Sequence, residues 1–96
     1  MLTIRTNCEN CNKDLPYNST EAMICSYECT FCRKCAEELL KNVCPNCGGG
    51  FTPRPIRPKA QLVKYPASDT RVLKPVVTAN HQKLLLRYED ILPENR

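Results

Sequence analysis

The spacing of eight cysteines constrains this 96-residue chain more than any other feature of its sequence. All eight lie between Cys8 and Cys47, and every later residue is of another type. A domain this small buries too little apolar surface to fold on its core alone, so it usually depends on disulfides, metal ions or oligomerisation. The cysteines must therefore hold the fold together. Their order is Cys8-x2-Cys11-x13-Cys25-x3-Cys29-x2-Cys32-x2-Cys35-x8-Cys44-x2-Cys47.

Metal binding, rather than disulfide formation, is the expected role of these cysteines. The residues before Cys8 contain no apolar run of the kind found in a secretory signal peptide, and no stretch approaches the ~20 apolar residues of a membrane span. We therefore expect a cytoplasmic protein without membrane contact, in a compartment where thiols stay reduced. Four cysteine pairs make two sites of four thiolates, which predicts two tetrahedral Zn²⁺ ions. Each ion would stabilise the fold by about 10 kcal/mol.

Three other cysteine motifs match parts of this pattern less well. Cys25-x3-Cys29-x2-Cys32 has the spacing that holds the cluster of radical SAM enzymes, but 96 residues are too few for the barrel of those enzymes. Cys29-x2-Cys32-x2-Cys35 begins like a bacterial ferredoxin motif, yet Leu39 stands where the fourth cysteine belongs. Cys44-Pro-Asn-Cys47 resembles a redox motif but lacks the surrounding βαβ pattern. Zinc remains the better interpretation.

The same spacing resembles the RING-type zinc finger, where Cys29-Thr-Phe-Cys32-Arg-Lys-Cys35 stands in place of a His-x-Phe-Cys-x-x-Cys segment. This resemblance implies a small metal-stabilised α+β fold of the treble-clef, cross-brace type, in which two four-cysteine sites interleave along the chain. One zinc would be bound by Cys8, Cys11, Cys32 and Cys35, and the other by Cys25, Cys29, Cys44 and Cys47.

Residues 1–50 also resemble a bacterial family of short proteins, domain of unknown function 1272, which has no assigned activity. The residues from Phe51 onward lie mostly outside this resemblance. It is carried by Asn7-Cys8 with Cys11, Lys13-Asp14-Leu15-Pro16, Glu21-Ala-Met-Ile-Cys-Ser26, Glu28-Cys-Thr-Phe-Cys-Arg33 and Cys44-Pro-Asn-Cys-Gly-Gly49.

Composition and charge divide the chain at Gly48-Gly49-Gly50, which contains every glycine. Residues 1–48 carry five Lys/Arg and six Asp/Glu, whereas residues 49–96 carry nine and four, so the net charge of +4 comes from the second half. We expect a RING-like two-zinc domain over residues 1–50, a Pro-rich basic linker with short extended segments over 51–77, and an amphipathic helix over 78–92. The aliphatic content of the second half predicts that it docks on the first half, on a second copy or on a partner.

Apolar periodicity predicts the local structure. Residues 21–26 are β-prone, and a helix that begins at Cys35 would place Ala36, Leu39, Leu40 and Val43 on one face. In the second half, residues 61–65 and 71–77 are short β-prone pieces, and Thr78 can cap the last helix. The expected core residues are Phe31, Tyr17, Met23 and Ile24.

The most plausible function is that of a structural zinc module that binds another protein of unknown identity. The candidate contact surface is the loop from Asp14 to Ser19 together with the outer face of the helix over residues 36–42. Enzyme activity is not expected, because four thiolates close each zinc site to water and substrate. Ubiquitin-ligase activity of the RING kind is disfavoured by Glu9-Asn10 and Gly48, which stand where ligases often have an aliphatic and a basic residue.

Nucleic-acid binding is the alternative from a different class. Residues 54–74 contain six basic residues and a single acid, Asp69. Six positive charges are enough for several phosphate contacts. A solvated basic linker explains the same residues, because Tyr65 is the only aromatic among them. The one histidine, His81, is expected on the surface of the last helix rather than on a metal. The six basic residues are Arg54, Arg57, Lys59, Lys64, Arg71 and Lys74.

Overall fold

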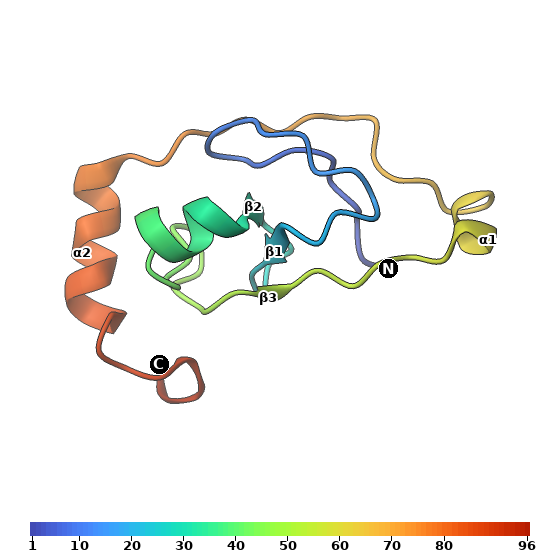
Figure 1. Cartoon of the computed structure of the whole chain (residues 1–96). Helices are drawn as coiled ribbons and strands as arrows, with labels where there is room; N and C mark the ends of the chain where they lie inside the picture. Colours follow the sequence, from blue (N-terminus) through green and yellow to red (C-terminus); the bar gives the residue numbers. More distant parts are fainter.

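A three-stranded antiparallel sheet organises the first half of the chain, in a computed structural model that describes residues 1–96 (Figure 1). The strands are β1 (Ala22–Ile24), β2 (Thr30–Cys32) and β3 (Thr52–Pro53), in the spatial order β2-β1-β3. Met23 of β1 pairs with Phe31 on one side and with Pro53 on the other. The sequence therefore predicts the small α+β class correctly, and β1 lies within the β-prone residues 21–26.

The short helix after β2 is a π-helix, η1 (Cys35–Leu39), rather than the expected α-helix. The amide of Leu40 donates to the carbonyl of Cys35, five residues back, at 2.8 Å. This wider turn carries Leu39 away from the face that Ala36 and Leu40 share, since the period is no longer 3.6 residues. Leu39 is 43% exposed, whereas the other three predicted face residues, Ala36, Leu40 and Val43, are buried.

The core lies between the sheet, η1 and the cysteines. Phe31 is 1% exposed, and its ring meets that of Phe51 edge to face at a centroid distance of 5.5 Å. Met23 is also buried, as predicted, while Ile24 and Tyr17 are only half-buried. Ile24 follows Met23 on β1 and therefore points to the opposite face of the sheet.

The second half of the chain leaves the sheet through β3 and returns along the first half. It runs through the short helix α1 (Lys59–Leu62) and an irregular segment to α2 (Thr78–Tyr88) and η2 (Pro93–Asn95) (Figure 1). The two β-prone predictions are wrong, because residues 61–65 form part of α1 and a turn, and residues 71–77 form no strand. Pro75 has no amide hydrogen and cannot join a regular ladder.

Hydrogen bonds to side chains and backbone of the first half fix the position of this returning segment. Asn7 Nδ2 donates to the carbonyl of Val72 at 2.8 Å, and Asn7 Oδ1 accepts from the Val72 amide at 3.3 Å. The Lys74 amide donates to the Glu9 carbonyl at 2.8 Å, and the Val76 amide donates to Asn10 Oδ1 at 2.9 Å. The contacts fall on alternate residues, as in an extended chain. Residues 72–76 thus dock on the protein's own first half.

The last helix differs from its prediction in where it ends and in which residue caps it. Residues 78–92 were expected to be helical, but α2 ends at Tyr88, and Leu92 is extended immediately before Pro93, as that proline requires. Thr78 is the first helical residue and does not cap, since Val77 occupies the N-cap position. The chain contains no helix with both the length and the apolar character needed to cross a membrane.

Candidate metal centres

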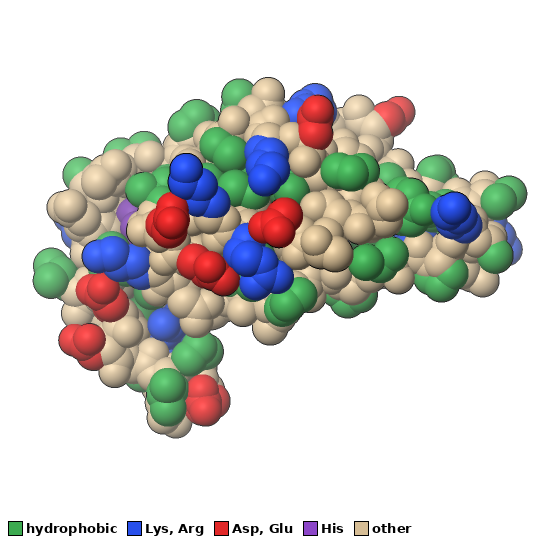
Figure 2. All heavy atoms as spheres, viewed as in Figure 1, with side chains coloured by type: hydrophobic (Ala, Val, Ile, Leu, Met, Phe, Trp, Pro, Cys, Tyr) green, Lys and Arg blue, Asp and Glu red, His purple; other side chains and the backbone are tan.

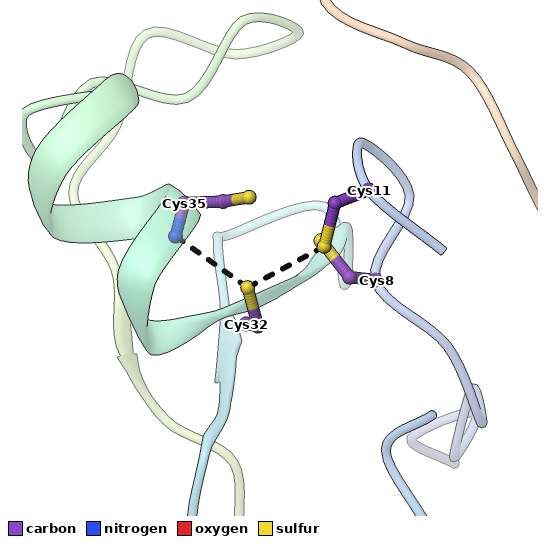
Figure 3. Close-up of side chains that lie close together, drawn as sticks. All are labelled: Cys8, Cys11, Cys32 and Cys35. Carbon is purple, nitrogen blue, oxygen red and sulfur yellow. Dashed lines mark hydrogen bonds between the residues drawn. The ribbon is translucent and has the colours of Figure 1, made fainter. Parts of the chain in front are cut away.

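The first cysteine cluster joins the N-terminal loop to the β2–η1 corner. The sulfur atoms of Cys8, Cys11, Cys32 and Cys35 all lie within 4.8 Å of one another (Figure 3). The Cys11 and Cys32 sulfurs are 3.7 Å apart. Four thiolates around a tetrahedral Zn²⁺ with Zn–S bonds near 2.3 Å are separated by about 3.8 Å, whereas a disulfide brings its sulfurs to about 2.05 Å. The cluster therefore fits a metal ion and not a disulfide.

Turns aim these sulfurs at one point. Asn12 has φ 64°, a left-handed conformation that asparagine tolerates better than most residues, and its amide donates to the Cys8 carbonyl at 2.9 Å. The Cys35 amide points at the Cys32 sulfur at 3.5 Å (Figure 3), and Asn10 Nδ2 donates to the Cys35 sulfur at 3.4 Å. Such N–H···S contacts stabilise thiolate ligands and fix their directions.

The second cysteine cluster lies at the other side of the core and is less complete. The sulfurs of Cys25, Cys44 and Cys47 lie within 4.8 Å of one another. Cys29 is not in this group, although its carbonyl accepts from the Cys25 amide at 3.1 Å. Its sulfur accepts a hydrogen bond from Asn46 Nδ2 at 3.2 Å. The predicted fourth residue therefore lies beside the cluster, in contact with Cys25, but its sulfur is not within 4.8 Å of all three gathered sulfurs.

Backbone amides two residues along the chain point at each sulfur of the second cluster. Tyr27 donates to Cys25 at 3.2 Å, Asn46 donates to Cys44 at 3.4 Å, and Gly49 donates to Cys47 at 3.4 Å. This repeated geometry is that of tight turns built around metal-binding thiolates. The Ser26 hydroxyl adds a further hydrogen bond to Cys47 at 3.3 Å.

Burial shapes the acidity of the thiols in both clusters. It raises the pKa of Cys25 to about 11 and also raises the pKa of Cys35, Cys44 and Cys32. Burial acts in the same direction on Cys11 and Cys47, but hydrogen bonds to their sulfurs outweigh it and lower the pKa of each. A divalent cation would offset the burial cost and bind the thiols as thiolates. The donor set thus suits a soft cation.

The two clusters interleave along the chain. Cys8 and Cys11 combine with Cys32 and Cys35, while Cys25 lies between these two pairs in sequence and combines with Cys44 and Cys47. The cysteines of the two clusters therefore alternate along the sequence, as they do in a cross-brace. Two such clusters can hold metal ions and link the N-terminal loop, the sheet and the turn after η1.

Three of the six basic residues singled out in the sequence are engaged within the protein. Arg54 is 4% exposed, and its guanidinium donates to the carbonyls of Leu15 at 3.3 Å, Pro16 at 2.8 Å and Arg5. Arg57 donates to the carbonyls of Tyr65 at 2.8 Å and Leu2, and Arg71 pairs with Asp14 at 2.9 Å. The other three, Lys59, Lys64 and Lys74, are exposed, and Lys64 Nζ lies 5.4 Å from the centre of the Tyr65 ring.

His81 is not the surface residue that the sequence predicts. It is 3% exposed, and its Nε2 lies 2.9 Å from the carbonyl oxygen of Val43, next to the second cluster. The helix turns this residue toward the first half, so the ring joins the two halves. Nothing in the sequence around His81 indicates its contact with the Val43 carbonyl, which lies 38 residues away along the chain.

Glu9 is a second buried polar residue that sequence reasoning missed. It is 3% exposed, its Oε2 accepts from the Thr30 amide at 2.6 Å, and it pairs with Arg5 at 3.2 Å. The Glu9 amide in turn donates to the Thr30 carbonyl at 3.0 Å. Glu9 therefore fastens the N-terminal loop to β2 and is not a free docking residue.

The predicted protein-contact surface is mixed in exposure. In the loop from Asp14 to Ser19, Leu15 is fully buried while Asp14 is exposed. On η1, Leu39 borders a hollow of about 300 Å³ that also reaches the first cluster. The residues that line this hollow are Cys11, Lys13, Cys32, Lys34, Cys35, Glu38 and Leu39.

Comparison with known proteins gives a family without an assigned activity. Residues 1–57 match the family described as protein of unknown function, DUF1272. The uncharacterized protein R02474 of Rhizobium meliloti (strain 1021) is 60% identical over 75 residues, which cover 78% of this chain and 89% of that protein. No solved structure matches. The matched family region contains all eight cysteines and therefore both clusters.

Proposed function

We propose that this chain, which belongs to the DUF1272 family, is a structural zinc module that holds two Zn²⁺ ions in a RING-like cross-brace and binds a protein partner. Cys8, Cys11, Cys32 and Cys35 would hold the first ion, and Cys25, Cys29, Cys44 and Cys47 the second. The observation that carries the proposal is the interleaved order of the two clusters. Each bound ion would supply positive charge for four thiolates and fix two distant segments together.

Cys29 completes the second site in this proposal. Its sulfur and the Cys25 sulfur belong to the same tight turn, in which the Glu28 amide donates to the Cys25 carbonyl at 3.2 Å and Glu28 has φ 65°. A small rotation of this turn would bring the Cys29 sulfur toward the other three. Asn46, which donates to Cys29, follows Cys44 and Pro45 in the opposite turn and is placed to guide that sulfur.

The closed sites favour a structural role over catalysis. A catalytic zinc keeps one position for water or substrate, whereas four thiolates occupy every position of a tetrahedral ion. The burial of Glu9 and the docking of Lys74 and Val76 on Glu9 and Asn10 also occupy the two positions between the first two cysteines, where RING ligases have a residue that helps dock the conjugating enzyme. Both features argue against ligase activity.

The hollow beside Leu39 is the proposed protein-binding surface. Leu39 is 43% exposed at its edge, and Lys34 and Glu38 at the rim offer one charge of each sign. The part of the hollow that Cys11, Cys32 and Cys35 line belongs to the first metal site. A partner would contact the exposed Leu39 with an aliphatic side chain of its own, and the charges of Lys34 and Glu38 would set its orientation. Only the exposed Lys59, Lys64 and Lys74 support the nucleic-acid alternative, so few phosphate contacts remain for it.

Metal analysis and native mass spectrometry of the purified chain test the zinc part of this proposal. We expect two Zn²⁺ per chain, with loss of both ions and of the fold on chelation. A chain that stays folded with no bound metal would contradict it. For the partner surface, a photo-crosslinking residue at Leu39 should capture protein in cells, whereas one at Tyr27, which is 67% exposed, serves as the control. Equal capture at both positions would reject the Leu39 surface.

A further inference from the structure

The two ends of the molecule carry opposite charge. The chain extends over 43 Å in one direction and only 25 and 18 Å in the others. One end, here called the basic end, consists of residues 55–66 with Met1 and Leu2 beside them. The other, the acidic end, consists of residues 88–95, which follow α2. Figure 1 shows α1 and the C-terminus at opposite ends of the molecule.

The basic end has no acid and no buried residue of its own. Residues 51–68 contain four Lys/Arg and no Asp or Glu, and three of the four lie in the basic end, at Arg57, Lys59 and Lys64. No residue from 55 to 66 is buried. Val63 is 89% exposed, Met1 82% and Ile56 50%. Because isolated exposed apolar residues are common but a group of them is not, this end has the character of an interface.

Two hollows give the basic end a shape that can receive side chains. One of about 310 Å³ is bordered by Ile4, Lys64 and Tyr65, and one of about 330 Å³ by Pro55 and Ile56. Both are also lined by Met1, Leu2, Ile4 and Arg57, so they adjoin. The second hollow therefore has a mainly apolar lining, the first has a mixed one, and Arg57 and Lys64 place cations beside them.

The acidic end offers the complementary surface. Residues 88–95 contain three acids and no Lys or Arg. Glu89 pairs with Lys41 at 3.7 Å, which leaves Asp90 and Glu94 as the carboxylates available to a second copy. Between these acids Leu92 is 63% exposed and Ile91 38% exposed. Figure 2 shows acidic and apolar side chains together at the end that carries the C-terminus, and basic and apolar side chains together at the α1 end. Two aliphatic side chains flanked by carboxylates match hollows rimmed by cations.

The two ends of one chain are held too far apart to meet. Arg96 fixes the acidic end to the first half by donating to the carbonyls of Asn42 at 2.8 Å and Gly48 at 3.0 Å. Pro93 also packs on Gly50. Two Zn²⁺ and eight thiolates would bring the net charge from +4 to about 0, which removes overall repulsion between copies.

We propose that the basic end of one copy binds the acidic end of a second copy, so that chains associate head to tail. Different surfaces of the two copies meet in this contact. Made once between successive copies it builds a ring or an open row, and made twice between two antiparallel copies it gives a two-fold dimer. This inference goes beyond the proposed zinc and partner-binding roles, since it uses neither the clusters nor the Leu39 hollow.

Sedimentation velocity of the full zinc-loaded chain, from micromolar to millimolar concentration, tests the contact. Wild-type chains should associate in a concentration-dependent way, and high salt should weaken the association. Lys59→Glu/Lys64→Glu and Asp90→Lys/Glu94→Lys should each weaken it at least tenfold, because each places like charges at the contact. The variant with all four substitutions should recover association, because the contact is then restored with its charges exchanged.

Two controls distinguish head-to-tail binding from a general charge effect and from membrane binding. Lys74→Glu/Lys83→Glu changes net charge as much as the basic-end variant does, but both side chains are exposed and lie outside the two ends, so it should leave association unchanged. A chain that stays monomeric at millimolar concentration, or a fourfold variant that does not recover, would overturn the contact. Binding of monomers to anionic vesicles that survives Asp90→Lys/Glu94→Lys would assign the basic end to a membrane surface and equally overturn it.

The zinc content of each variant distinguishes the two proposals. Monomers that carry two Zn²⁺ would reject head-to-tail association and leave the zinc module intact. Chains that associate as expected but bind no metal would reject the zinc module and leave the contact intact.

Discussion

The two cysteine clusters differ in how tightly the polypeptide gathers their sulfurs. In the first cluster all four sulfurs lie within 4.8 Å of one another, and two of them come from the end of β2 and the start of η1. In the second, three sulfurs meet this condition, and Cys29, which contacts Cys25, does not. Regular secondary structure fixes a ligand better than a turn does. The first site should therefore be preorganised for its ion. In the second site, the Cys29 sulfur should move toward the other three when the ion binds.

The largest effect is expected from breaking the first cluster. Cys32 is 2% exposed and joins β2 to the turn before η1, so Cys32→Ser removes a thiolate from the better-ordered site. Loss of a structural zinc costs about 10 kcal/mol, which is as much as the whole stability of a small domain. We expect an unfolded first half with no bound zinc by circular dichroism and metal analysis.

Ser26→Ala is the matched control for that substitution, because it removes only a hydrogen bond to Cys47 and keeps every cysteine. It should retain two zinc ions. If Cys32→Ser keeps a folded chain with two zinc ions, the first cluster is not a zinc site and the comparison between the clusters fails.

A smaller effect is expected at Cys29, where the two clusters differ most. Cys29→Ser leaves the three gathered sulfurs of the second cluster in place, so the chain should stay folded while zinc at that site binds more weakly by about a hundredfold or more. Cys44→Ser, which removes one of the three, should empty the second site altogether. Competition with a chromophoric zinc chelator measures both. Equal losses in the two variants would show that Cys29 is as fixed a ligand as Cys44.

The sequence predicted what depends on spacing and on local pattern. Cysteine order indicated two metal clusters and, with the residues around them, the family, which the match over residues 1–57 confirms. The β-prone residues 21–26 predicted β1, and Met23 and Phe31 were correctly expected in the core, whereas β2 and β3 were not predicted. The strand and core signals are local, whereas the cysteine order works over a longer range because the spacing of metal-binding pairs is itself a recognisable pattern.

Long-range polar contacts could not be predicted in the same way. Asn7 binds Val72, 65 residues away, and buried Arg54 reaches the carbonyls of Leu15 and Pro16. Asparagine and arginine are mostly exposed in proteins, and only the partner reveals which of them is buried. His81 was misplaced for this reason. The π-helix was missed because a single extra residue in a turn leaves little trace in apolar periodicity.

Asparagine amides near each cluster offer a finer test of the comparison. Asn46 Nδ2 donates to the Cys29 sulfur, and Asn10 Nδ2 donates to the Cys35 sulfur. Loss of such an outer contact typically lowers metal affinity by about 10–100-fold. Asn46→Ala should reach the upper part of this range, because Cys29 depends on it, whereas Asn10→Ala should change zinc affinity less. Chelator competition measures both, and a larger loss in Asn10→Ala would reverse the ranking of the two sites.

The smallest expected effect lies in the turn after the second cluster. Gly48 has φ 74°, and a Cβ atom there would lie 2.8 Å from the ring of Tyr88. Gly48→Ala should therefore destabilise the chain by about 1–2 kcal/mol from the backbone alone, with an added cost from the contact with α2. When Tyr88 is already alanine, this added cost should disappear. Introducing Gly48→Ala into the Tyr88→Ala chain should then lower the free energy of unfolding only by the backbone part. Chemical denaturation of the four chains gives the coupling energy. A coupling of zero would mean that Tyr88 does not pack on this turn and that α2 leaves the second site uncovered.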